Sequence, residues 1–152
     1  MIKRYPEILP DYTPIHNLHI SQVLALALKE GGLESKNSGK VKVSYHDPCY
    51  LGRGLNIYDA PREVLSSLDG VELVEMKRNR ENSFCCGART LGYYVPDISE
   101  DTARERIREF EETGADLLIT ACAYCKGIFQ KVLSSPDRER VKDLTELVDE
   151  RT

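Results

Sequence analysis

The sequence lacks the features that would place the chain in a membrane or in the secretory pathway. Its longest apolar stretch, around residues 23–28, is far shorter than the roughly 20 residues that a membrane-spanning helix needs. The first residues, MIKRYP, contain no apolar signal segment. There is no excess of basic residues either, and the net charge of −4 argues against a nucleic-acid partner. We therefore expect a cytoplasmic protein without direct membrane insertion, whose contact with any membrane complex runs through a partner subunit.

Internal repeats and low-complexity tracts are also absent. The 152 residues, of which 41% are hydrophobic, suffice for one domain with an apolar core but not for two. Residues 1–17 contain three prolines and show no periodicity, so we expect an irregular lead-in there. Residues 18–150 are expected to form the domain.

Short apolar strands alternate with helices along that domain. The patterns predict strands at residues 41–45, 71–75 and 116–120, each bounded by turn residues. Helices are predicted at residues 20–28, 59–68, 97–113, 122–133 and 141–148. Strands separated by helices require crossover connections, so the fold class is α/β, a mostly parallel sheet covered by helices.

The chain contains five cysteines, an odd number that excludes complete pairing into disulfides. In a cytosolic protein such cysteines more often bind metal or take part in catalysis than form structural bridges. Scattered single cysteines would fit buried apolar residues equally well. Four of these five, however, occur in two tight local groups, Cys85-Cys86 and Cys122-Ala-Tyr-Cys125.

Each cysteine group follows one predicted strand. Cys49 comes after the first, Cys85 and Cys86 after the second, and Cys122 and Cys125 after the third. Ligands of open parallel sheets collect outside the carboxyl ends of the strands. We therefore expect all five thiols to converge on one site.

The two local groups of cysteines differ in the chemistry that they allow. Cys122 and Cys125 open a helix, where free N–H groups and the helix dipole favour thiolate; alone, this pair fits a thioredoxin-like pair, half a zinc site or an iron–sulfur loop. Adjacent Cys85 and Cys86 cannot form an unstrained disulfide, but they can bind neighbouring irons of a cluster. Gly87 lets the backbone turn closely past the sulfurs.

These residues together resemble the CCG, or cysteine-rich, domain family. The pattern is Cys49, then Cys85-Cys86-Gly87, then Cys122-x-x-Cys125. The surrounding sequence motifs are similar to those of the D subunits of heterodisulfide reductases: HDPCYLGR (46–53), YDAPREV (58–64), NREN (79–82) and TGAD (113–116). The family also occurs in the B subunits of those reductases, in glycolate and lactate oxidase iron–sulfur subunits and in anaerobic glycerol-3-phosphate dehydrogenase.

The resemblance implies an oxidoreductase module that holds a non-cubane 4Fe-4S cluster. Its ligands would be Cys49, Cys85, Cys86, Cys122 and Cys125, with Gly87 beside them. The resemblance also implies that the module reduces disulfides or transfers electrons. Its electron-transfer partner subunit would be ferredoxin-like or a flavoprotein, and its substrate a small-molecule or protein disulfide. Some members of the family are thought to hold zinc instead.

Two features depart from the family pattern. Members usually carry two such domains in tandem, whereas this chain has one, so we expect a split subunit, a small relative or a piece of a longer protein. Many relatives also have a glycine-rich stretch after CCG, where this chain has the bulkier ARTLGYYV at residues 88–95. Larger side chains beside the site would alter the access of a substrate.

Several charged residues near the cysteines have more than one interpretation. His46 has the chemistry of a metal ligand or a proton donor, but capping of the strand or turn is the favoured interpretation. Arg53 and Lys126 would offset cluster charge, steer an anionic substrate, or serve neither purpose. Arg104, Arg106 and Arg108 alternate with glutamates and are predicted to form a solvated helix face.

Two further functions compete with the iron–sulfur hypothesis. One is a zinc-stabilised docking module without chemistry of its own, for which four thiolates suffice. The other is a metal-free thiol switch that uses Cys122 and Cys125.

Overall fold

The computed structural model describes residues 17–36 and 38–152. Its centre is one four-stranded, all-parallel sheet in the order β2-β1-β3-β4. The strands are β1 (Val41–His46), β2 (Val71–Leu73), β3 (Leu117–Thr120) and β4 (Val141–Asp143). The predicted α/β class with a parallel sheet is confirmed, and the predicted lead-in lies outside the described residues except for Asn17.

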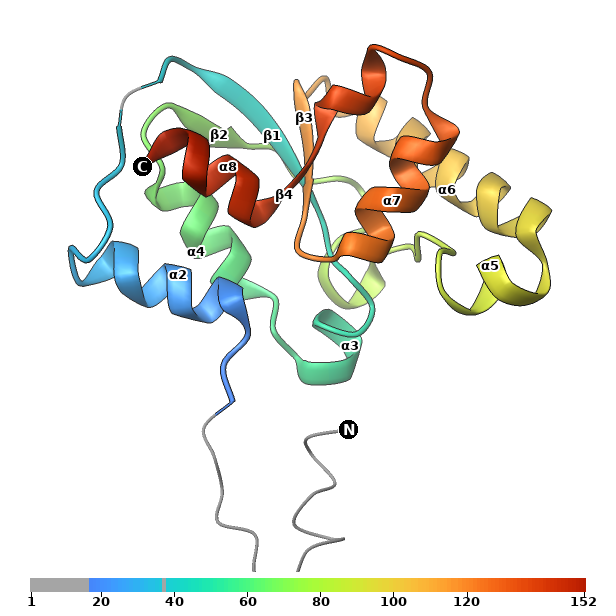
Figure 1. Cartoon of the computed structure of the whole chain (residues 1–152), viewed down its shortest axis with the longest axis horizontal. Coiled ribbons are helices and arrows are strands. Elements are labelled where there is room, and N and C mark those ends of the chain that lie inside the picture. Colours follow the sequence, from blue (N-terminus) through green and yellow to red (C-terminus); the bar gives the residue numbers. More distant parts are fainter. Residues whose placement is uncertain (1–16, 37) are drawn as a thin grey trace, which may run out of the picture.

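Helices cover both faces of the sheet (Figure 1). On one face lie α2 (Ile20–Lys29), α4 (Asp59–Ser67) and α8 (Leu144–Arg151), and on the other α6 (Pro96–Glu111) and α7 (Ala123–Val132). Shorter helical turns are α3 (Gly52–Leu55), α5 (Thr90–Tyr94), η2 (Arg80–Asn82) and η3 (Asp137–Arg140). In this described part of the chain, no helix is both long enough and apolar enough to cross a membrane.

The alternation of side chains along each strand separates two apolar cores. Val43 and Tyr45 of β1 pack under α4 and α8, with Ile119 of β3. Leu118, the next residue along β3, packs on the opposite face with Phe110 of α6 and other residues of that core. By the same alternation Ser44 and His46 point toward the α6–α7 side.

The prediction of a helix over residues 141–148 is wrong at its start. Val141–Asp143 is the edge strand β4, with Val141 paired to Leu118 and almost fully buried. The helix begins only at Leu144, where the Asp143 side chain and Glu146 form a capping box. Three residues are too few to show the alternation that marks a strand, so tertiary pairing decided this element.

Candidate metal centre

All five cysteines line one cavity of about 220 Å³. They reach it from three segments: the turn after β1, the loop between η2 and α5, and the start of α7. All five are free thiols. The predicted convergence is therefore seen, although these segments lie far apart in the sequence.

The order of the strands explains why the cavity forms at this place. From β1 the chain crosses through α4 to β2 on one side, and from β3 it crosses through α7 to β4 on the other. The crossovers leave in opposite directions from these two central strands, which opens a crevice at their carboxyl ends. Cys49 and Cys122 directly follow those two strand ends.

Gly87 brings the Cys85–Cys86 loop close to α6. Its φ is +78°, and a Cβ at this position would lie 3.0 Å from the carbonyl oxygen of Ser99. The Ser99 hydroxyl donates to the Gly87 carbonyl at 3.1 Å, which holds the loop there. Cys86 is buried and Cys85 half-buried, while the Gly87 N–H donates to the Cys85 sulfur at 3.4 Å. Only glycine fits both this left-handed backbone and this close approach.

Cys122 sits at the start of α7 as its N-cap, in an extended conformation. Its thiolate is stabilised chiefly by a hydrogen bond from the Cys125 thiol and also by the backbone N–H groups of Cys125 and Tyr124. These hydrogen bonds outweigh the opposing effect of burial and lower the pKa of Cys122 to about 6. The backbone N–H groups at the helix start therefore act in the predicted direction, as the smaller contribution beside the Cys125 thiol.

The other cysteine side chains form hydrogen bonds with one another. Cys86 and Cys125 have their sulfurs 3.2 Å apart. Hydrogen bonds from Cys125 and Cys85 lower the pKa of Cys86 far below that of an ordinary thiol. Conversely, hydrogen bonds to Cys122 and Cys86 raise the pKa of Cys125.

This donor set fits a cluster of soft metal ions. Thiolates are the ligands that iron–sulfur clusters and other soft metals prefer. Among the residues that line the cavity there is no carboxylate, and the remaining surface is apolar or aromatic apart from Thr90 and Arg89. Metal ions would take the place of the protons that the sulfurs now share.

A buried ion pair fixes the turn that carries Cys49. Asp47 receives two hydrogen bonds from the Arg62 guanidinium, at 2.7 and 2.9 Å, and a third from the backbone N–H of Arg80 at 2.8 Å. Arg62 belongs to α4 and Arg80 to the segment that leads to Cys85. One carboxylate thus ties together two of the three cysteine-bearing segments.

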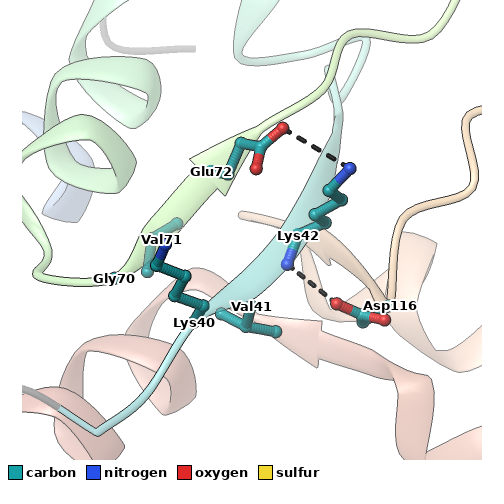
Figure 2. Close-up of a pocket in the computed structure, with 7 residues that line it drawn as sticks. All are labelled: Lys40, Val41, Lys42, Gly70, Val71, Glu72 and Asp116. Atoms are coloured by element: carbon teal, nitrogen blue, oxygen red, sulfur yellow. Dashed lines mark hydrogen bonds and ion pairs between the residues drawn. The ribbon is translucent and has the colours of Figure 1, made fainter.

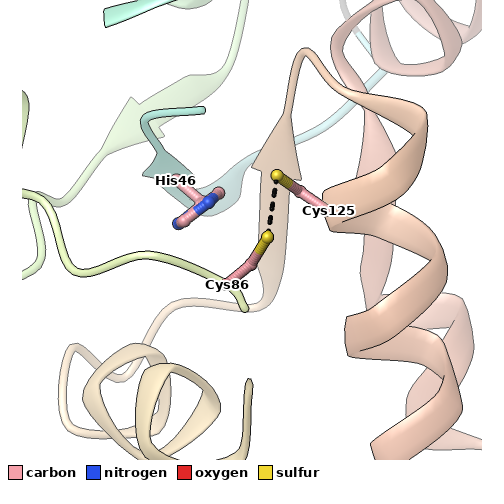
Figure 3. A group of neighbouring side chains, drawn as sticks. All are labelled: His46, Cys86 and Cys125. Carbon is pink, nitrogen blue, oxygen red and sulfur yellow. Dashed lines mark hydrogen bonds between the residues drawn. The ribbon is translucent and has the colours of Figure 1, made fainter. Parts of the chain in front are cut away.

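His46 lies beside the cysteines, and the other two charged residues singled out from the sequence, Arg53 and Lys126, do not line the cavity. One ring nitrogen of His46 and the sulfurs of Cys86 and Cys125 lie within 4.8 Å of one another (Figure 3). Arg53 donates instead to the Ser83 carbonyl at 2.6 Å, and Lys126 pairs with Glu146 of α8 at 2.6 Å.

Two arginines near the site did not stand out in the sequence. Arg106 was expected on a solvated face, but it is fully buried, unlike its neighbours Arg104 and Arg108. Its place between Ala103 and Phe110 on the apolar stripe of α6 was the available signal. Arg89 lines the cavity and stacks on the Tyr50 ring at 4.8 Å.

A larger cavity, of about 500 Å³, lies at the opposite edge of the sheet, around the start of β1 and β2 (Figure 2). Lys42, which lines it, pairs with Glu72 at 3.7 Å, and the backbone N–H of Lys42 donates to Asp116 at 2.8 Å. Among the described residues, those that line this cavity include no cysteine or histidine. The chemistry of the side chains, rather than the size of the cavity, therefore makes the cysteine-lined cavity the candidate metal centre.

Comparison with known proteins agrees with this arrangement. Residues 43–130, from β1 into α7, match the cysteine-rich domain (CCG) family. The chain belongs to this family. The D subunit of the dihydromethanophenazine:CoB–CoM heterodisulfide reductase of Methanosarcina mazei is 35% identical over 96% of the chain. The probable iron–sulfur-binding oxidoreductase FadF of Bacillus subtilis is 34% identical over 86% of it, and the B subunit of the fumarate reductase (CoM/CoB) of Methanothermobacter marburgensis is 32% identical over 72%.

This CCG domain is much shorter than these relatives. It spans 36% of the Methanosarcina protein, 19% of FadF and 21% of the fumarate reductase protein. The similarity to the D subunits of heterodisulfide reductases that the sequence indicated is confirmed.

Proposed function

We propose that this CCG domain is an iron–sulfur redox module of a larger oxidoreductase of the heterodisulfide reductase type. The observation that carries the proposal is the convergence of five free thiols on one cavity at the carboxyl ends of β1 and β3. The names of several relatives, an iron–sulfur-binding oxidoreductase among them, support the choice of iron–sulfur over other soft metals. We place the module in the cytoplasm.

The finer proposal is a non-cubane 4Fe-4S cluster held by Cys49, Cys85, Cys86, Cys122 and Cys125. Five thiolates exceed the four that a zinc ion takes, and adjacent cysteines suit neighbouring irons better than one ion. When bound, the cluster supplies one-electron transfer at a potential set by burial and by hydrogen bonds to sulfur. The protein's part is to hold the sulfurs, exclude water from them and control access.

The exposed rim of the cavity is the proposed place for a disulfide substrate or an electron-transfer partner. Tyr50 and Tyr124 line the cavity and are 63% and 61% exposed. Arg89 and Leu91, from the bulky segment after CCG, line it as well. Aromatic residues and arginine are both enriched in protein interfaces. A partner subunit that is ferredoxin-like or a flavoprotein would reach the cluster here.

Anaerobic reconstitution with iron and sulfide tests the proposal. We expect brown protein that retains both elements after desalting, with an absorption band that bleaches on reduction. Replacement of each cysteine by serine in turn should lower the iron content, because all five sulfurs are ligands. Thr90→Ser is the matched control, since Thr90 lines the cavity without offering a sulfur.

Two outcomes would overturn parts of this proposal. Colourless protein that holds stoichiometric zinc after anaerobic reconstitution would refute the iron–sulfur function. Full iron content in any one cysteine variant would reduce the ligand set to four and refute the five-thiolate cluster.

A further inference from the structure

His46 presents one ring nitrogen to the cysteines from a fully buried position. It ends β1 on the α6–α7 side of the sheet, and the residue is 1% exposed. Its ring packs edge-on against Phe129 of α7, with centroids 4.9 Å apart. Nε2 is buried and has no hydrogen-bond partner among the described residues. A polar atom so placed needs a partner, because an unsatisfied buried donor or acceptor costs free energy.

The other ring nitrogen identifies where the proton is. The Nε–H of Arg106 points to His46 Nδ1 at 3.1 Å. A guanidinium can only donate hydrogen bonds, so Nδ1 must accept and cannot carry a proton. In a neutral imidazole the proton is then on Nε2.

Arg106 is itself held by several partners, so its Nε–H has little freedom to turn away. It donates to Glu109 at 2.5 Å, to the Arg78 carbonyl at 2.8 Å and to the Ser83 hydroxyl at 3.4 Å. The imidazolium form is thus disfavoured by the geometry at Nδ1, because its second N–H would point at the Arg106 donor.

We infer that Arg106 fixes His46 as the Nε2–H tautomer, which directs its N–H toward the sulfurs of Cys86 and Cys125 as a donor for a cluster bound there and is not a metal ligand. A ligating nitrogen offers its lone pair to the metal; because Nδ1 keeps its lone pair for the Arg106 N–H, ligation through Nε2 would require the ring to lose its last proton and become an imidazolate anion. His46 is therefore the hydrogen-bond donor to the cluster, and Arg106 is the positioning residue behind it.

The consequence for the cluster, which rests on the proposed function, is a higher reduction potential. An N–H directed at a cluster sulfur stabilises the negative charge added on reduction. His46→Phe retains an aromatic ring of similar shape against Phe129 and removes the donor. We expect this variant to bind as much iron and sulfide as the unmodified chain, with a midpoint potential shifted to more negative values. His46→Gln, which keeps an N–H donor, should recover part of the shift.

Arg106→Met tests the positioning role, with Arg104→Met as the matched control on the exposed side of α6. We expect a negative shift in Arg106→Met and none in Arg104→Met. Loss of iron in His46→Phe would instead identify His46 as a ligand and overturn the inference. An unchanged potential in that variant, with iron retained, would overturn it as well.

A measurement on metal-free protein separates this inference from the proposed function and from misfolding of the variants. In reduced protein labelled with ¹⁵N-histidine, the His46 signal is the one that His46→Phe removes. We expect its Nε2 to show the shift of a protonated ring nitrogen and its Nδ1 that of a lone-pair nitrogen. A protonated Nδ1 would refute the tautomer, whether or not the chain binds iron.

Discussion

Replacing Arg62 by methionine should cost the domain much of its stability. The Arg62 and Asp47 side chains are only 8% and 3% exposed, and two parallel hydrogen bonds join them. The variant leaves Asp47 buried with the single backbone N–H of Arg80 as a donor to its carboxylate. Removal of one partner from a buried pair costs about 3–5 kcal/mol.

The second carboxylate on Arg62 adds little to this estimate. Glu75 is 35% exposed, and the loss of a pair that water can reach costs about 0–1 kcal/mol. A loss of about 3–5 kcal/mol is large against the roughly 5–15 kcal/mol by which domains are stable. The variant should also bind iron less well, because Asp47 ties the Cys49 turn to the segment that leads to Cys85.

Urea unfolding of the metal-free, reduced protein measures this loss without a contribution from the cluster. Arg104→Met is the control: it removes an exposed pair with Glu100, whose loss costs little because water competes for both side chains. Asp47→Asn combined with Arg62→Met should cost less than the sum of the two single changes, because the contact is lost only once. A loss below about 1 kcal/mol in Arg62→Met, close to that of the control, would refute the assignment of a buried, desolvated pair.

Three further changes have outcomes that the structure predicts. Glu109→Gln should destabilise the domain by about 3–5 kcal/mol. Burial raises the pKa of Glu109, but hydrogen bonds from Arg78 and Arg106 outweigh it and lower the pKa, so this stabilisation is present at neutral pH. The difference in unfolding free energy between the unmodified chain and the variant should therefore shrink as acid unfolding is followed below pH 4.5. In metal-free protein the alkylation rate of Cys122 should rise through a pKa of about 6 and level off by neutral pH; a midpoint near the usual value of about 8.5 would contradict the stabilisation of this thiolate by Cys125 and the helix start. Gly87→Ala should cost about 1–2 kcal/mol for its left-handed backbone and lower iron loading, as unfolding and iron analysis would show; full stability would mean that the loop tolerates a Cβ.

The sequence by itself determined the fold class and the place where the five cysteines converge. Local patterns suffice for this, because the period of apolar residues distinguishes strand from helix and turn residues mark their ends. In parallel strands all carboxyl ends meet at one edge, so cysteines that each follow a strand converge there. The sequence motifs around Cys49 and Cys85 also identified the family.

The tertiary structure decided what depends on partners far away in the chain. Arg106 and His46 are 60 residues apart, and nothing near either residue shows that they meet. The same holds for Arg62 and Asp47, for the short edge strand β4, and for Lys126, which turns to Glu146 of α8. Arg106 is buried because segments outside its own helix bring it hydrogen-bond acceptors, His46 of β1 and the carbonyl of Arg78. The sequence places the sulfurs, and packing of α6 against β1 decides which proton points at them.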